Sequence, residues 1–150
     1  MNESNSLTID RDLSRQQARR IRASLGACWY NARTVLRRCP ELTGGIYVEG
    51  WVCVCPNYIP NEHGWCELNG VIIDPTYYAI DRPLNYFSAL RFTAEQIAKV
   101  RGHEPLIKQW CGWLKPETNE SSAANDRYAL AYAQAQAYSK AHYQPPENIK

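Results

Sequence analysis

Three side chains in the first half of the chain have the types that acyl-transfer chemistry needs: Cys28, His63 and Asp74. A thiolate can attack an acyl carbon, and an imidazole can accept the released proton and return it. A carboxylate can fix the tautomer and orientation of that imidazole. Such a set would form a thioester that water or an amine then resolves. The three residues are far apart in the sequence, so the elements that carry them must bring them together.

A β-hairpin is predicted around the dipeptide Asn69-Gly70. It lies between two short runs, residues 65–68 and 71–73, that are rich in strand-favouring types. An Asn-Gly pair between such runs indicates a two-residue hairpin turn, because both turn positions require a positive φ. With this turn, Leu68 lies opposite Val71.

The same register places His63 and Asp74 on one face of the hairpin. Trp65 then lies opposite Asp74, and His63 lies opposite Thr76. Side chains alternate between faces along a strand, and directly opposed residues share a face. The four side chains therefore emerge on one side, with His63 and Asp74 as diagonal neighbours roughly 5–8 Å apart at Cβ.

A helix is predicted to begin at about Cys28 and to stop before Pro40. Its broad apolar face contains Trp29, Ala32, Val35 and Leu36. In the first turn of a helix, free amide groups and the helix dipole favour a thiolate over a thiol. If the apolar face packs on the sheet, the helix N-terminus delivers Cys28 near His63. The amide groups there, including that of Cys28, can bind a developing oxyanion.

The remaining patterns predict a single α+β domain over residues 1–150. Residues 1–10 and 144–150 are expected to be flexible. Residues 123–143 predict a peripheral docking helix with a weak apolar stripe; a self-association surface is the alternative. The other predicted elements are a helix over 14–25 with a capping box at Ser14 and Gln17 and an end at Gly26, strands over 46–55 and 86–92, a helix from Thr93 to near Gly102, and a helix from Pro105 with Leu106, Ile107, Trp110, Cys111 and Leu114 on its apolar face.

Composition gives only broad limits on partners and location. The net charge of +2 provides no global electrostatic reason for binding nucleic acid. No apolar run is long enough for a membrane span and the N-terminus lacks a secretory core, so a cytoplasmic protein with free thiols is expected. Locally, the first quarter is rich in arginine, which indicates either a solvated helix face or a contact for an acidic or nucleic-acid partner: Arg11, Arg15, Arg19, Arg20, Arg22, Arg33, Arg37 and Arg38.

Four motifs over roughly residues 25–80 resemble those of the transglutaminase-like branch of the papain-fold cysteine enzymes. The motifs are Cys28-Trp-Tyr-Asn-Ala, Tyr47-Val-Glu-Gly-Trp51, His63-Gly-Trp65 and Ile72-Ile-Asp-Pro-Thr76. Arylamine N-acetyltransferases and many small bacterial and phage proteins share this order of Cys, His and Asp. The resemblance implies a papain-like core in which a cysteine helix packs on an antiparallel sheet. It also implies Cys28 as nucleophile, His63 as base and Asp74 as the residue that orients His63.

The same motifs suggest residues that line a substrate pocket, namely Trp65, Trp51, Tyr47, Glu49 and Asn31. Trp65 is expected to line the acyl pocket or to shield the His63–Asp74 pair from water, with core packing as the alternative. The hairpin is shorter than in large transglutaminases, and nothing resembles their calcium-binding regions. For an oxyanion side chain the candidates are Trp51 and two glutamines upstream of the cysteine, Gln16 and Gln17, although ordinary helix positions also explain these glutamines.

Two other classes of function compete with the enzyme. Cys53, Cys55, His63 and Cys66 form a possible zinc set, but His63 and Cys66 point to opposite faces of one strand. A catalytically inactive module that binds through the arginine-rich helix is the other alternative. The enzyme hypothesis needs no cofactor or metal, and its substrate would be an amide- or acyl-bearing protein, peptide or small molecule. Hydrolysis by a peptidase, amidase or deamidase is favoured slightly over transfer to an amine.

Overall fold

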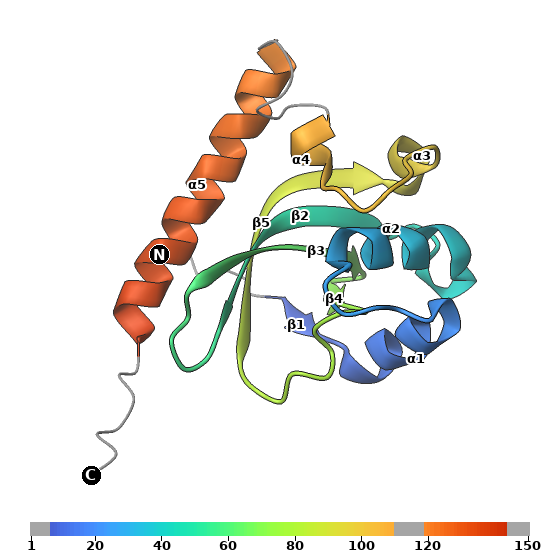
Figure 1. Ribbon diagram of the computed structural model, residues 1–150, viewed down its shortest axis with the longest axis horizontal. Helices are drawn as coiled ribbons and strands as arrows, with labels where there is room; N and C mark the ends of the chain where they lie inside the picture. Colours follow the sequence, from blue (N-terminus) through green and yellow to red (C-terminus); the bar gives the residue numbers. More distant parts are fainter. Residues whose placement is uncertain (1–6, 110–118, 144–150) are drawn as a thin grey trace.

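A five-stranded mixed sheet forms the centre of the α+β fold (Figure 1). The computed structural model describes residues 7–109 and 119–143. The strand order is β1-β4-β3-β2-β5, in which only β1 and β4 are parallel. The strands are β1 Thr8–Ile9, β2 Ile46–Val54, β3 Pro60–Leu68, β4 Val71–Ile73 and β5 Leu84–Thr93.

The predicted hairpin register is confirmed next to the turn, but the expected pairs of Trp65 with Asp74 and of His63 with Thr76 lie beyond the end of β4 and are not formed. Leu68 pairs with Val71, and Asn69 and Gly70 have φ values of 49° and 79° at the turn. β4 ends at Ile73, whereas β3 extends back to Pro60. The pairing with β4 therefore covers only the last three residues of β3, and among the described residues no strand lies beside the part of β3 that contains His63 on that edge.

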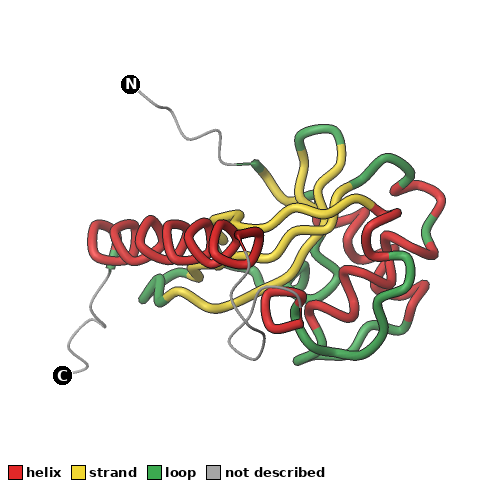
Figure 2. Tube along the Cα trace, turned by 90° about the horizontal axis from the view of Figure 1, so that it is seen from above, coloured by secondary structure: helices red, strands yellow, loops and turns green. Residues whose placement is uncertain are grey.

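The helices lie around both ends of the sheet. In the views of Figures 1 and 2, α5 lies at one end and α1, α2 and α3 at the other. No helix in the described ranges is long and apolar enough to cross a membrane. The helices are α1 Arg11–Ile21, α2 Cys28–Arg38, the short 3-10 helix η1 Pro40–Leu42, α3 Ala94–Ile97, α4 Leu106–Gln109 and α5 Asn119–His142.

The start of α1 corrects the prediction that Ser14 caps this helix. Asp10 is the N-cap, and its Oδ1 accepts a hydrogen bond from the amide of Leu13 at 2.9 Å. Asp caps a helix as well as Ser does, so the earlier residue starts the helix. The helix also ends early, because Arg22 rather than Gly26 adopts the left-handed conformation after Ile21.

The first residues that the structure describes are ordered, although residues 1–10 were expected to be flexible. Thr8 and Ile9 form β1 beside β4, and the amide of Asp10 donates to the carbonyl of Ile72 at 2.8 Å. A two-residue parallel strand depends on a distant partner, so local sequence gives no signal for it. The expectation for residues 1–6 and 144–150 lies outside the described residues.

Of the two helices predicted after β5, the first is shorter in the structure and the second continues to the edge of the described residues. The capping box of Thr93 and Gln96 is present, but α3 ends at Ile97 and does not continue to Gly102. α4 begins directly after Pro105, as expected, and the predicted positions Trp110, Cys111 and Leu114 lie outside the described residues.

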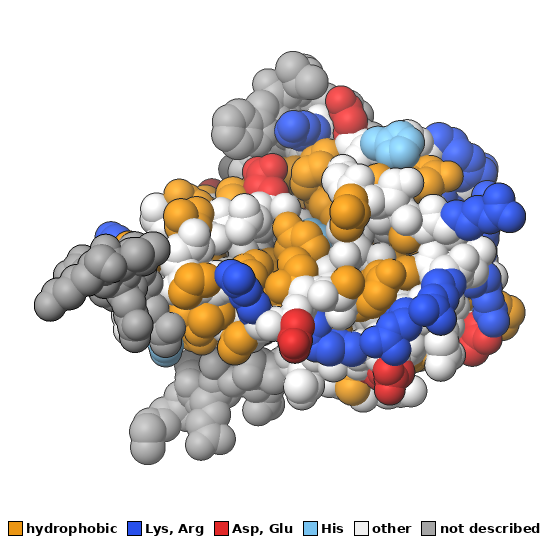
Figure 3. Space-filling model, turned by 60° about the horizontal axis from the view of Figure 1, so that its bottom comes forward, with side chains coloured by type: hydrophobic (Ala, Val, Ile, Leu, Met, Phe, Trp, Pro, Cys, Tyr) orange, Lys and Arg blue, Asp and Glu red, His pale blue; other side chains and the backbone are white. Residues whose placement is uncertain are grey.

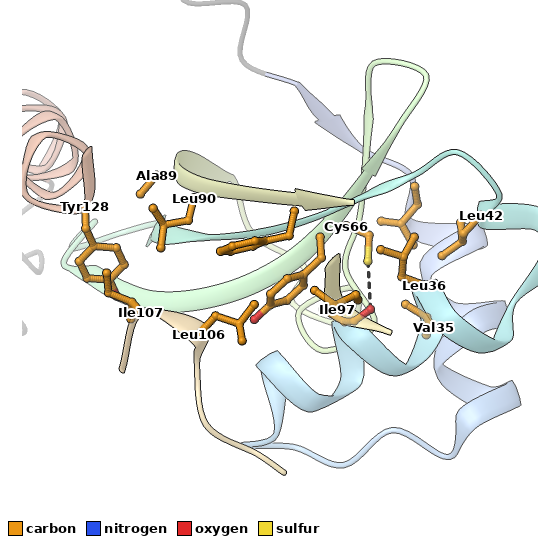
Figure 4. Close-up of a cluster of buried hydrophobic side chains, with 14 of the residues drawn as sticks. Val35, Leu36, Leu42, Cys66, Ala89, Leu90, Ile97, Leu106, Ile107 and Tyr128 are labelled. Atoms are coloured by element: carbon orange, nitrogen blue, oxygen red, sulfur yellow. Dashed lines mark hydrogen bonds between the residues drawn. The ribbon is translucent and has the colours of Figure 1, made fainter. Parts of the chain in front are cut away.

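The main hydrophobic core lies between the helices and one face of the sheet (Figure 4). α2 packs Ala32, Val35 and Leu36 against Cys66 of β3, and α5 contributes Tyr128. A second buried cluster on the opposite face contains Val48, Val52, Trp65 and Ile72. The sheet is therefore buried on both sides, with α2 on the first face.

Candidate active site

Cys28 is the first residue of α2, as the sequence predicts. The preceding residue, Ala27, makes no side-chain capping hydrogen bond, and the first intrahelical bond runs from the amide of Asn31 to the carbonyl of Ala27 at 2.8 Å. The amide groups of residues 28–30 therefore come before the first hydrogen bond of the helix. The side chain of Cys28 is buried, with 8% of its surface exposed.

His63 and Asp74 form a buried pair. Nε2 of His63 lies 2.7 Å from Oδ2 of Asp74, and the two residues are 1% and 0% exposed. This contact leaves Nδ1 of His63 for another partner. Nδ1 is also buried, and it has no hydrogen-bond partner among the described residues.

The ring of His63 nevertheless interacts with the side chain of Cys28. Burial by itself would lower the pKa of His63, but the charge of Asp74, its hydrogen bond and the nearby Cys28 together raise this pKa to about 9. With this pKa the ring carries its second proton at neutral pH. The structure thus brings the three predicted residues together, with Asp74 bound to Nε2 of His63 and Cys28 close enough to influence its pKa.

The carboxylate of Asp74 accepts four hydrogen bonds. Oδ1 accepts from the amides of Thr76 and Tyr77, both at 2.9 Å, and Oδ2 accepts from His63 and from the hydroxyl of Tyr86 at 2.8 Å. Burial would raise the pKa of Asp74, but the charge and hydrogen bond of His63 and the two amides lower it below its ordinary value. Asp74 is therefore held as a carboxylate in one orientation.

The N-terminus of α2 reaches His63 along the edge of β3 that β4 leaves open. Trp29 packs directly on Gly64, where an added Cβ would lie 2.7 Å from Cδ1 of the indole. Asn31 donates from Nδ2 to the carbonyl of Ser24 at 2.8 Å and to Oγ1 of Thr76 at 3.0 Å. Asn31 thus connects the loop before the cysteine to the turn after Asp74.

Aromatic rings cover the histidine. Tyr77 stacks on His63 with ring centroids 3.8 Å apart, and Trp65 lies nearly parallel to it at 6.2 Å. Trp65 is fully buried, and its indole nitrogen donates to Glu67 at 3.2 Å. It also lines a pocket of about 240 Å³ on the sheet face opposite α2. Trp65 therefore belongs to the buried core of this face, as the alternative of core packing expects, and its role in an acyl pocket or in shielding stays a prediction.

The other expected pocket residues have hydrogen bonds elsewhere. The hydroxyl of Tyr47 donates to Glu49, which lies 3.8 Å from the buried Arg33. Glu49 also accepts the amides of Leu106 and Ile107, so it caps the start of α4. Trp51 packs under α5 instead, with its indole nitrogen donating to the carbonyl of Tyr128 at 3.3 Å. The hydrogen bonds of Tyr47, Glu49 and Trp51 therefore do not involve the three candidate catalytic residues.

The residues of the alternative zinc set point in different directions. The thiol of Cys53 donates to the carbonyl of Ala135, and that of Cys66 donates to the carbonyl of Ala32. Burial raises the pKa of Cys53 to about 11 and raises that of Cys66 further. Within residues 7–109 and 119–143, no group of three or more His, Cys, Asp or Glu is arranged to hold a metal ion.

Many of the N-terminal arginines have structural partners. Arg11, Arg33 and Arg37 each donate to backbone carbonyls of distant segments. Arg15 pairs with Asp12, and Arg20 pairs with Glu41. Figure 3 shows apolar side chains in the middle of one face and a row of Lys and Arg side chains along its edge. Three of the eight arginines thus bind the backbone of distant segments, whereas the ion pairs of Arg15 and Arg20 lie at the surface.

Tyr77, Tyr86 and Ser14 contact the candidate site, and sequence reasoning missed all three. The hydroxyl of Ser14 accepts the amide of Asp74 at 2.9 Å. Tyr77 directly follows the Asp-Pro-Thr motif, a proximity that could have suggested it; no local signal points to the other two. Gln16 is exposed and Gln17 is buried in α1, where Oε1 of Gln17 lacks a hydrogen-bond partner among the described residues.

Comparisons with family models, curated proteins and solved structures found no match to this chain.

Proposed function

We propose that this protein is a cysteine-dependent acyl-transfer enzyme with Cys28 as nucleophile, His63 as general base and acid, and Asp74 as the residue that orients His63. One observation carries the proposal: Nε2 of a buried histidine is bound to a buried aspartate, and the same ring interacts with a cysteine at a helix N-terminus that has no side-chain cap. The expected transglutaminase-like core is part of the same proposal, since a cysteine helix packs here on a largely antiparallel sheet.

The reaction begins with attack of the Cys28 thiolate on the carbonyl carbon of an amide. The amide groups at the start of α2 stabilise the oxyanion, and the imidazolium of His63 gives its proton to the leaving amine. A thioester and a free amine result. His63 then takes a proton from water, the hydroxide attacks the thioester, and the carboxylic acid and the thiol are released. An amine in place of this water would give a new amide.

The sharpest test uses the other cysteines as internal controls. Native protein is treated with iodoacetamide near neutral pH, and the labelled sites are mapped by mass spectrometry. Cys55 is the more accessible thiol, because it is only partly buried whereas Cys28 is buried. We expect Cys28 to be labelled faster than Cys55, by about tenfold or more, since the thiolate is the reacting form.

The matched variant is His63→Ala. It should slow the labelling of Cys28 and leave that of Cys55 unchanged. Equal labelling of both cysteines in the native protein, or a rate at Cys28 that does not depend on His63, would rule out an activated nucleophile.

Hydrolysis of a peptide or other amide is favoured slightly over transfer to an amine. The open choice can be tested by incubating a panel of amides and activated esters with and without a primary amine and identifying the products. We also propose a reducing compartment such as the cytoplasm, because Cys28, Cys39, Cys53, Cys55 and Cys66 are free thiols.

A further inference from the structure

Tyr86 reaches the candidate site from the far edge of the sheet. It lies in β5, and β3 and β2 separate this strand from β4, which leads into Asp74. Three strand spacings in a flat sheet would be roughly 14 Å, more than a tyrosine side chain spans. Asp74 lies beyond the end of β4 with its side chain at His63 of β3, and there its Oδ2 accepts a hydrogen bond from the hydroxyl of Tyr86 at 2.8 Å.

The contact of Tyr86 is made to the same oxygen that binds His63. The phenol ring is held edge-on against Trp65, with ring centroids 5.0 Å apart. Trp65 in turn lies beside the ring of His63. Tyr86 thus touches both Asp74 and the aromatic wall behind His63, but not the cysteine.

We propose that Tyr86 is a positioning residue of the triad, which fixes the rotation of the Asp74 carboxylate and moderates the pull of this carboxylate on His63. The inference rests on the proposed function. Backbone amides hold Oδ1, and without Tyr86 only His63 would hold Oδ2. A hydroxyl that donates to a carboxylate spreads its negative charge, so the carboxylate attracts the imidazolium less strongly.

The charged and titratable groups around this contact come from every neighbouring element. Asp74 after β4, Cys28 of α2 and Tyr77 of the following turn act on His63. Tyr86 of β5 contacts Asp74, and the charges of Arg11 in α1 and of Tyr77 also act on Tyr86. Burial, followed by the charge and hydrogen bond of Asp74, raises the pKa of Tyr86 well above its ordinary value. The hydroxyl therefore stays protonated and remains a donor.

The test follows the imidazole of His63 by nitrogen NMR in a Cys28→Ala background, which removes the coupled thiol. Tyr86→Phe should raise the pKa of His63 by roughly half a unit to one unit, because Asp74 loses a donor. Tyr47→Phe is the matched control, since its hydroxyl also donates to a buried carboxylate, that of Glu49. This control should leave the titration of His63 unchanged.

A second readout uses the native cysteine. Tyr86→Phe should slow iodoacetamide labelling of Cys28 by about 3- to 10-fold, because the imidazole is less well oriented. If this variant does not fold, the tyrosine ring carbons in the wild-type protein provide the test. The Cζ signal of Tyr86 should shift with the titration of His63, and that of Tyr47 should not.

An unchanged titration of His63 in Tyr86→Phe, an equal shift in Tyr47→Phe, or a Cζ signal of Tyr86 that does not respond to His63 would overturn the proposal. These titration measurements do not require Cys28 to be reactive. Failure of the positioning role is therefore distinguishable from failure of the proposed enzyme, which the labelling of Cys28 against Cys55 decides.

Discussion

The side chain of Asp74 accepts hydrogen bonds from two amides, an imidazole and a phenol. A buried carboxylate is stable only when such donors compensate for lost hydration. The same donors restrict its rotation, so Nε2 of His63 has one well-defined partner. A histidine held in this way has a fixed ring orientation, which a freely rotating histidine lacks.

Asp74→Asn tests this arrangement at the scale of one residue. The burial that lowers the pKa of His63 remains in the variant, while the charge that raises it is removed. We therefore expect the pKa of His63 to fall from about 9 to below 6.5. NMR of the imidazole nitrogens at a series of pH values measures this change. Labelling of Cys28 should slow by about 10- to 100-fold. The exposed Asp12→Asn is the control, and a His63 titration that stays near 9 in Asp74→Asn would contradict the assignment.

At the scale of elements, the position of α2 on β3 depends on a glycine. Trp29 approaches Gly64 so closely that an added Cβ would lie 2.7 Å from the indole Cδ1 and 3.2 Å from Cα of Trp29. The main chain of the helix would have to move away from the strand. Cys28 is the neighbour of Trp29, so this movement would separate it from His63.

Gly64→Ala should therefore destabilise the fold by about 1–3 kcal/mol and slow the labelling of Cys28. Gly45→Ala is a matched control, because an added Cβ there would lie 2.8 Å from the carbonyl oxygen of Leu42, near the other end of α2. Denaturant unfolding and iodoacetamide labelling measure the two effects. Similar losses of Cys28 reactivity in the two variants would show that general destabilisation explains them.

Some polar residues that look functional in the sequence instead hold secondary-structure elements together, namely Arg33, Tyr47 and Glu49. Glu49 caps α4, and Arg33 binds the carbonyls of Gly102 and Glu104 in the segment before that helix. This buried network fixes residues 102–107 against β2. The position of α4 therefore depends on a strand residue that is more than fifty positions earlier.

At the scale of the whole molecule, the His63–Asp74 pair makes stability depend on pH. The pKa of His63 is raised in the folded state, so its contribution is fully present below about 6.5 and is lost as the pH rises through about 9. The pKa of Asp74 is lowered, so its contribution is present above about 3.9 and is lost as the pH falls below that value.

We expect the free energy of unfolding to decrease by about 3 kcal/mol between pH 6.5 and pH 9, given the pKa of about 9 for His63. Urea unfolding at a series of pH values measures this change. The double variant His63→Gln with Asp74→Asn removes both titrating groups and should show a much smaller change. Parallel curves for the two proteins would mean that the pair does not control stability in this range.

The local sequence determined the hairpin, the start of α2 and thereby the three residues of the candidate site. Asn69-Gly70 sets the register through turn geometry alone, and the apolar pattern that ends before Pro40 sets the helix that begins at Cys28. These features depend on neighbours within a few residues, so they can be predicted without knowledge of the fold.

The tertiary structure alone decided what surrounds those three residues. Ser14 of α1 and Tyr86 of β5 each form a hydrogen bond with Asp74, although they lie 60 and 12 positions away from it in the sequence. Likewise, no local pattern tells that Trp65 faces away from α2 or that Glu49 caps a helix. Such contacts join residues that are far apart in sequence, and their pairing depends on the energy of the whole packed chain.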